Sequence, residues 1–190
     1  MVMSNNLINI LKKFIFLFIF SIFTASLSFA DVLEYEHGTY TGESFFGRPH
    51  GRGEFVWNEG DSYSGSWVHG SREGRGRQIF EDGSIYVGLY KDDAINGKGK
   101  YTYSNGKVYV GNFKDSLFDG EGTLTFADDG SVFVGKFKED KRDGEGTMNF
   151  VDGTILTGMY VNDAAEGAHI ATYEDGTTEE LLFKDGELVE

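Results

Sequence analysis

One pattern recurs through the chain at a nearly constant interval and limits the folds that are open to it. In its fullest form the pattern reads YxGxWxxGxxxGxG, begins at Tyr63 and ends at Gly76, with an Asp-Gly pair a few residues beyond. A fixed period between about 20 and 50 residues indicates a repeat protein. The first position is occupied in turn by Tyr40, Tyr63, Tyr86, Tyr109, Phe133 and Leu156, at steps of 23, 23, 23, 24 and 23 residues.

Each repeat contains two stretches in which large apolar residues alternate with small or polar ones. Lys100–Tyr103 is an example of the first stretch, and Tyr86–Tyr90 is an example of the second. Alternation with a period of two predicts a β-strand. The density of glycine and β-branched residues disfavours a helix. Each repeat is therefore predicted to be a β-hairpin.

The Asp-Gly turn is predicted to be three residues long. A loop at Glu81–Gly83 pairs Phe80 with Ser84 and keeps the aromatic residues of both strands on one face, which a two-residue loop would not do. This is a turn followed by a bulge with glycine in the left-handed conformation. The loop Ala127–Gly130 is one residue longer, which accounts for the single step of 24 residues.

The tyrosine, glycine and second aromatic residue of each repeat share one strand face. The glycine leaves space for a large ring from a neighbouring strand, and we expect Phe80, Tyr103 or Phe126 to lie across such spaces. The resulting aromatic row is predicted to be the core first, because ring burial is strongly stabilising. It is also a candidate binding face, comprising Trp57, Tyr63, Trp67, Tyr90, Tyr103, Phe113, Phe126 and Phe137.

The opposite face is also apolar in the second strands of the middle repeats. The repeats predict only hairpins and no further element to cover this stripe, although threonines in the intervening strands dilute it. Two interpretations remain open: β-propensity on a solvated face, or a contact surface for self-association or a protein partner. The candidate stripe comprises Ile85, Val87, Val108, Val110, Val132 and Val134.

The first thirty residues differ from the rest. Lys12 and Lys13 precede the apolar run Phe14–Ala25, and Ser28–Ala30 places small residues before a cut after Ala30. This order is typical of a secretory signal peptide. We therefore expect a signal peptide at 1–30, a repeat domain at 31–190, and export to the bacterial periplasm or the medium. An uncleaved membrane anchor is the alternative.

The chain of 190 residues is acidic and lacks cysteine, with 17 Lys and Arg against 31 Asp and Glu and a formal net charge of −14. Such a charge disfavours nucleic acid and anionic lipid, which are captured by Lys and Arg. It favours solubility and is compatible with basic partners or divalent cations. Without disulfides, stability must come from packing and strand pairing.

No residue pattern predicts catalysis. The histidines His37, His50, His69 and His169 are expected at turns or loops of four different repeats, and the GxG pairs lack the following helix of a phosphate-binding loop. We therefore predict no enzyme activity and no cofactor. Acidic pairs leave Ca²⁺ open, since stacked carboxylates supply its oxygen ligands, although Asp-Gly is also ordinary turn chemistry. These pairs are Glu81-Asp82, Asp92-Asp93, Asp128-Asp129 and Glu139-Asp140.

The pattern and its period resemble the MORN (membrane occupation and recognition nexus) repeat over about residues 33 to 186. The chain departs from the MORN pattern at Ser44, where Trp67 stands in the next copy, at Leu156 and at His169. Leu33–Gly38 and Glu179–Gly186 read as partial terminal repeats. The resemblance implies an all-β, single-layer antiparallel sheet of successive hairpins, twisted and curved into an elongated trough.

Proteins similar to this one use MORN arrays as protein-binding scaffolds, as dimerisation rods or in phospholipid contact. The sequence is therefore interpreted as an exported, non-enzymatic scaffold that acts through its trough or its β-branched face. The alternative is a lipid- or envelope-associated module that holds its ligand against the aromatic trough. A secreted effector is a third possibility.

Overall fold

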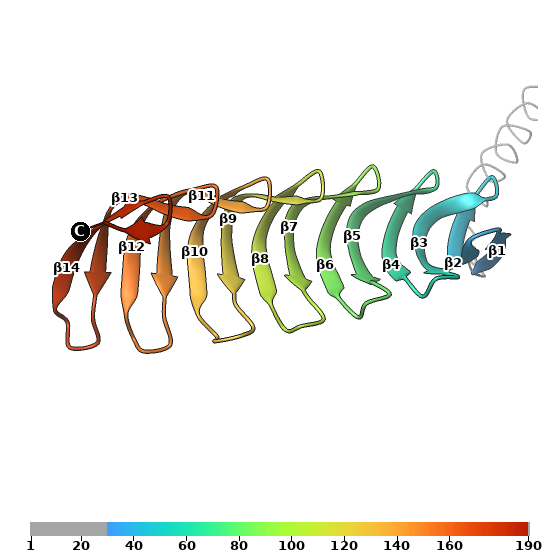
Figure 1. The fold of residues 1–190 in the computed structure, drawn as a ribbon. Coiled ribbons are helices and arrows are strands. Elements are labelled where there is room, and N and C mark those ends of the chain that lie inside the picture. Colours follow the sequence, from blue (N-terminus) through green and yellow to red (C-terminus); the bar gives the residue numbers. More distant parts are fainter. Residues whose placement is uncertain (1–29, 190) are drawn as a thin grey trace, which may run out of the picture.

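The computed structural model describes residues 30–189, which consist of strands and turns (Figure 1). One open sheet contains every strand, in chain order, and each strand pairs antiparallel with its sequence neighbours. The predicted single-layer hairpin array is confirmed. The strands are β1 (Asp31–Tyr35), β2 (Gly38–Phe45), β3 (Arg48–Trp57), β4 (Ser62–Val68), β5 (Ser71–Ile79), β6 (Ile85–Lys91), β7 (Ala94–Thr102), β8 (Val108–Lys114), β9 (Leu117–Thr125), β10 (Val132–Lys138), β11 (Lys141–Asn149), β12 (Ile155–Val161), β13 (Ala164–Thr172), β14 (Thr178–Lys184) and β15 (Glu187–Leu188).

The register aligns one glycine from each strand of β2–β12 in a row that runs across the sheet. Beside this row each hairpin contains a register shift, as between Gly65 and Trp67 of β4, and the sheet bends there. Figure 1 shows the bend as the curved upper ends of the strands. The row comprises Gly42, Gly53, Gly65, Gly76, Gly88, Gly99, Gly111, Gly122, Gly135, Gly146 and Gly158, and it ends at His169 of β13.

In the first four repeats the ring over the glycine pair is the tyrosine of the same repeat, and in the fifth it is Phe133. A Cβ atom added to Gly65 would lie 2.6 Å from Cζ of Tyr63, and one added to Gly76 would lie 2.5 Å from it. The expectation that Phe80 or its later equivalents cover the glycines is therefore wrong. The tyrosine folds back over its own hairpin, because two facing glycines leave a hollow that fits its ring.

The buried rings form a continuous chain of edge-to-face contacts along the molecule. Trp67 meets Tyr63 and Tyr40 at centroid distances of 5.0 and 5.5 Å, with the planes nearly perpendicular. Edge-to-face pairs gain from the quadrupoles of the rings as well as from burial. The chain joins Tyr40, Trp67, Tyr63, Tyr90, Tyr86, Phe113, Tyr109, Phe137, Phe133, Tyr160, His169 and Phe183.

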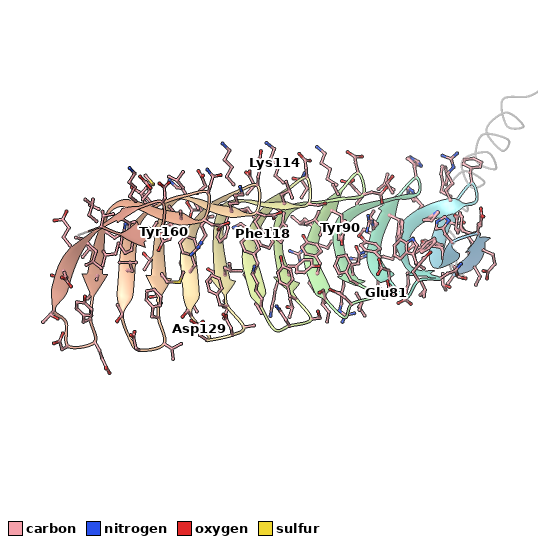
Figure 2. All side chains as sticks on the ribbon, in the orientation of Figure 1. Glu81, Tyr90, Lys114, Phe118, Asp129 and Tyr160 are labelled. Carbon is pink, nitrogen blue, oxygen red and sulfur yellow. The ribbon has the colours of Figure 1, made fainter. Side chains whose placement is uncertain are left out.

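The turns at the two ends of the strands are of different types. On the side of the turns labelled Glu81 and Asp129 in Figure 2, Phe80 pairs with Ser84 as predicted. The N–H of Phe80 donates to the Ser84 carbonyl oxygen at 2.9 Å, the carbonyl oxygen of Phe80 accepts the N–H of Gly83, and Gly83 has a left-handed φ of 85°. The three-residue loop is confirmed. At the opposite edge, near Lys114, two-residue turns have two consecutive positive φ angles, the geometry of type I′ turns.

Candidate interaction surfaces

Five members of the predicted aromatic binding face lie inside the core. Their side chains are at most 4% exposed, so their rings have almost no surface to offer a ligand, and the structure corrects the expectation for these positions. The reason is that successive repeats pack their rings against one another. The five are Tyr63, Trp67, Tyr90, Phe113 and Phe137, whereas Trp57, Tyr103 and Phe126 are half-buried along the wall of the trough.

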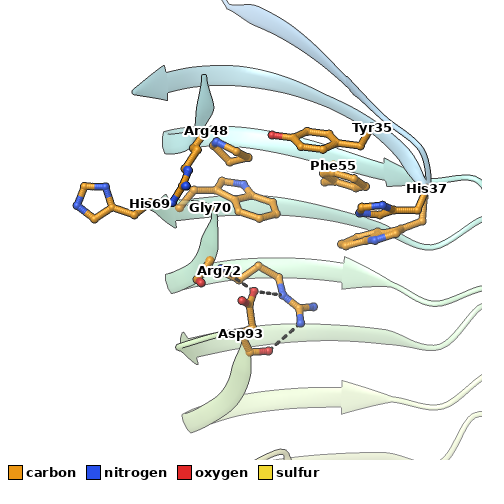
Figure 3. A pocket seen from close by; sticks show the side chains of 12 residues that line it. Tyr35, His37, Arg48, Phe55, His69, Gly70, Arg72 and Asp93 are labelled. Atoms are coloured by element: carbon orange, nitrogen blue, oxygen red, sulfur yellow. Dashed lines mark hydrogen bonds and ion pairs between the residues drawn. The ribbon is translucent and has the colours of Figure 1, made fainter. Parts of the chain in front are cut away.

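A pocket of about 430 Å³ opens in the trough at the N-terminal end (Figure 3). The aromatic rings of Tyr35 and Phe55 form one side, and Arg72 and Asp93 lie below them in Figure 3. Phe55 packs against Trp57 at a centroid distance of 4.5 Å. The pocket combines an aromatic wall with a paired guanidinium group, a lining that suits a small or extended ligand.

The Arg72 guanidinium group joins two repeats. Its Nε lies 3.2 Å from Oδ1 of Asp93, its Nη1 donates to Oε1 of Gln78 at 2.7 Å, and its carbon lies 5.0 Å from the centre of Tyr90. Arg142 repeats this ion pair with Asp163 three repeats later. This pair of arginines was not predicted from the sequence, although both stand at the same position of their repeats.

The predicted stripe lies on the outer face of the sheet, and three of its valines are accessible to solvent. Val87, Val110 and Val134 are 49, 49 and 46% exposed, and they alternate with Lys100 and Thr123 in the cross-strand register. These residues line a shallow hollow of about 570 Å³. The other members of the stripe, Ile85, Val108 and Val132, are half-buried between neighbouring strands. The outer face therefore presents accessible valines at its centre, interleaved with polar side chains such as Lys100 and Thr123.

Acidic residues in the two-residue turns accept hydrogen bonds from backbone N–H groups of the preceding repeat. Asp93 accepts the N–H of Arg72 at 2.8 Å, and Asp140 accepts that of Phe118 at 2.7 Å. Within residues 30–189, no three His, Asp or Glu side chains converge as a metal-ion cluster requires. These contacts give the acids a backbone-capping role that the sequence analysis did not identify.

The acids of the wider turns cap their own loops. The backbone N–H and hydroxyl of Ser84 donate to Asp82 and hold the pKa of its carboxyl below its ordinary value. Ser131 does the same for Asp129. These are Asx turns, the local chemistry for which Asp is favoured in such loops.

His37 and His69 lie in turns as expected, whereas His50 and His169 lie in strands. His169 lies in β13 and is fully buried, and His50 lies in β3 with its ring 5.2 Å from that of His69, so two repeats share a histidine pair. Among residues 30–189, no hydrogen bond joins a histidine ring to a serine hydroxyl or to a carboxylate. The described chain therefore shows no hydrogen-bonded catalytic dyad.

The chain belongs to the MORN repeat family. Five consecutive copies match the family at residues 40–62, 63–85, 86–108, 109–131 and 133–155, more than half of the sequence. Strands β12 and β13 continue the array as a sixth hairpin. No curated protein matches the sequence.

The fold is similar to that of the TCP10 domain of Danio rerio CPAP, with a TM-score of 0.51 and 17% identity over 80% of this chain and 73% of that one. The TCP domain of Drosophila melanogaster SAS-4 (dCPAP), solved with a proline-rich motif of Ana2 (dSTIL), has a TM-score of 0.47 and 14% identity. That match covers 83% of this chain and 92% of the other. The likeness to the Danio rerio domain concerns the fold alone.

The predicted signal peptide and its apolar run lie outside the described residues. Within the part that the structure describes, no helix has the length and apolar character needed to cross a membrane.

Proposed function

We propose that this protein is an exported, non-enzymatic scaffold that binds a protein partner through the centre of its outer face. Export rests on the sequence of residues 1–30. The observation that supports the binding surface is the half-exposed row of Val87, Val110 and Val134 on a sheet that has one layer. We take this row of accessible apolar side chains, on a sheet face that no other described element covers, to be the interaction surface.

The outer face suits a protein better than a small ligand. Its hollow is shallow and open, and Lys100 and Thr123 alternate with the valines, so apolar contact and hydrogen bonding are both available. The rigid sheet holds these side chains at fixed spacing, which lowers the entropy cost of binding. The trough is less suited, because five of its eight candidate rings are in the core.

The test is a double substitution, Val87→Lys and Val110→Lys, assayed by partner capture from envelope extract and by light scattering. We expect the variant to fold normally and to lose the partner or the self-association, since two lysines would be desolvated at the interface. Val161→Lys with Thr178→Lys adds the same charge near the C-terminal end and should preserve binding. Unchanged capture and unchanged oligomeric state in the stripe variant would refute the proposal.

A further inference from the structure

Two consecutive repeats place pairs of basic residues on the outer face. The residues on either side of the second glycine of the GxG pair are Arg75 and Arg77 in the second repeat, and Lys98 and Lys100 in the third. The fourth and fifth repeats have Glu and Thr at these positions. All four basic side chains are exposed, and we call them the basic patch.

The cross-strand register surrounds the basic patch with uncharged neighbours. Leu89 of β6 lies opposite Arg75. Val87 of the same strand lies opposite Arg77 on one side and opposite Lys100 on the other. No ion pair within residues 30–189 involves the four cations, so their charges are available to a ligand. The partners of the patch on β4 and β8 are Ser64, Val110 and Asn112.

Three carboxylates stand at the margins of the basic patch. Glu54 is on β3 and Glu121 is on β9, each two strands from the nearest cation of the patch. Glu73 is on β5, two residues before Arg75. Because these acids surround the patch and do not lie between its cations, the positive surface is confined to β5–β7, which are neighbouring strands in Figure 1. Two strand spacings make this width about 10 Å.

The shallow hollow of about 570 Å³ on the outer face adjoins the cations. Lys98 and Lys100 line it together with Val87 and Val110, which are each 49% exposed. Lys100 lies between these two valines in the register. The hollow therefore offers positive charge and aliphatic surface at neighbouring positions.

We propose that the partner of the outer face binds there through an extended acidic segment. Its carboxylates pair with the basic patch, and its aliphatic side chains pack on Val87 and Val110. This inference rests on the proposed function, because it assigns the chemistry of the partner to the same surface. The chain has a formal net charge of −14, but near physiological ionic strength charges act over only about 8 Å, so the sign of the local surface decides.

The spacing of the cations suits an extended chain. The side chains of β5 and β7 are about 10 Å apart across β6, a distance that an extended segment covers in about three residues. A segment that lies across the strands therefore meets a pair of cations at every third residue. Its intervening residues lie over Val87 and Leu89 of β6.

A protein segment fits this surface better than a long polyanion. Nucleic acids and sulfated polysaccharides carry charge along their whole length but no aliphatic side chains, whereas valines alternate with the cations here. A long polymer would also extend past the basic patch to Glu54 on one side and Glu121 on the other. A short segment in which aliphatic residues separate the acids avoids both difficulties.

The probe is a short dye-labelled peptide with Glu at every third position and Val and Ser elsewhere. Matched peptides have Gln or Lys in place of each Glu. Binding to the full chain is measured by fluorescence anisotropy. We expect the Glu peptide to bind about tenfold more tightly than the Gln peptide, because two or more exposed charge pairs form. The Lys peptide should bind least, and rising salt should remove the preference for Glu.

A double substitution tests the residues. Arg77→Gln with Lys100→Gln should remove the preference for the Glu peptide and leave the affinity for the Gln peptide unchanged. The matched control is Lys138→Gln with Lys141→Gln, which removes the same charge from two exposed residues of the fifth repeat and should preserve the preference. A thermal unfolding scan of each variant confirms that it is folded.

Three outcomes would overturn the acidic-segment assignment. They are equal affinity for the Glu and Gln peptides, a preference that survives Arg77→Gln with Lys100→Gln, and displacement of the Glu peptide by a sulfated polysaccharide as effectively as by unlabelled peptide. The last outcome would assign the patch to polyanions in general.

Partner capture judges the proposed function separately. Capture that is lost with Val87→Lys and Val110→Lys but kept with Arg77→Gln and Lys100→Gln would leave the proposed function standing and refute the acidic segment. Capture that the valine substitutions leave unchanged would refute the proposed function, whatever the peptides do.

Discussion

At the scale of single residues, the repeat depends on a tyrosine ring that lies over two glycines. The hydroxyl of Tyr86 donates to the Leu89 carbonyl oxygen at 3.0 Å, so the polar end of the ring is satisfied beside the register shift. The ring itself fills the hollow above Gly88 and Gly99. Glycine is needed here for close approach, because any side chain would occupy the place of the ring.

The corresponding prediction is that Gly88→Ala destabilises the sheet. The added Cβ would lie 2.5 Å from Cζ of Tyr86 and 2.7 Å from Cα of Gly99, and the backbone partner cannot move aside cheaply. We expect the free energy of unfolding to fall by about 1–3 kcal/mol or more, the usual range for overpacking. Urea unfolding measures this change. The control is Val87→Ala on the exposed face of the same strand, and an equal loss in both variants would contradict the explanation.

At the scale of the hairpin, the sixth repeat shows how two departures from the pattern compensate. Leu156 stands where the other repeats have an aromatic ring, and His169 stands where the glycine row would continue. A Cβ on Gly158 would lie 2.6 Å from Nδ1 of His169, so the imidazole fills the hollow that the ring fills elsewhere. Among the described residues, buried Nε2 of His169 has no hydrogen-bond partner.

This exchange predicts coupling between the two positions. Leu156→Tyr alone would drive its ring into the place of His169, and His169→Gly alone would leave a cavity, whereas the double variant restores the arrangement of the other repeats. We expect the double variant to be more stable than the sum of the single changes by about 0.5–3 kcal/mol. A double-mutant cycle by urea unfolding measures this value, and simple additivity would argue against the exchange.

At the scale of the whole molecule, stability comes from contacts between neighbouring repeats. Trp67, Tyr90 and Phe113 each contact the tyrosine of their own repeat and the tyrosine of the repeat before. Tyr90, for example, lies 5.3 Å from Tyr86 and 5.0 Å from Tyr63 between ring centroids. Phe118 also stacks on Tyr109 at 3.6 Å. Such an array is held together by nearest-neighbour terms along its length. Conditions that affect all tyrosines therefore affect the entire rod.

Alkaline pH provides such a condition. Burial raises the pKa of Tyr63 and of Tyr86 from the ordinary 10.0 to about 12. A raised pKa means that the folded state holds its protons more tightly, so this contribution to stability is complete below pH 10 and is lost as the pH rises through about 12. We expect unfolding to begin in this window, with tyrosinate absorbance appearing together with the loss of β-structure by circular dichroism.

The variant Tyr86→Phe separates the two roles of the tyrosine. It removes the hydrogen bond to Leu89 and should cost about 0.5–1.5 kcal/mol at neutral pH. It should also make stability less dependent on pH between 10 and 12, because one titrating group is gone. Phe133, which occupies this place in the fifth repeat, shows that the fold accepts the ring without its hydroxyl. An unchanged alkaline profile would contradict the assignment.

Much of the fold was predictable, because the period of the sequence and the alternation of side chains act locally. The spacing of Phe80 and Ser84 was enough to predict the length of their turn, and the extra residue at Ala127–Gly130 was enough to explain the longer repeat. Strand faces also follow from local alternation, which placed Val87 and Val110 on the outer face as the structure shows.

The sequence alone thus determined the hairpins, their register and the repeat family, since these depend on residues close together along the chain. Only the tertiary structure decided which rings are accessible, that Tyr63 covers its own glycines, and that Asp93 caps the repeat before it. The physical reason is that side-chain burial depends on how neighbouring repeats bend and pack against one another, and residue spacing within one repeat does not specify that packing.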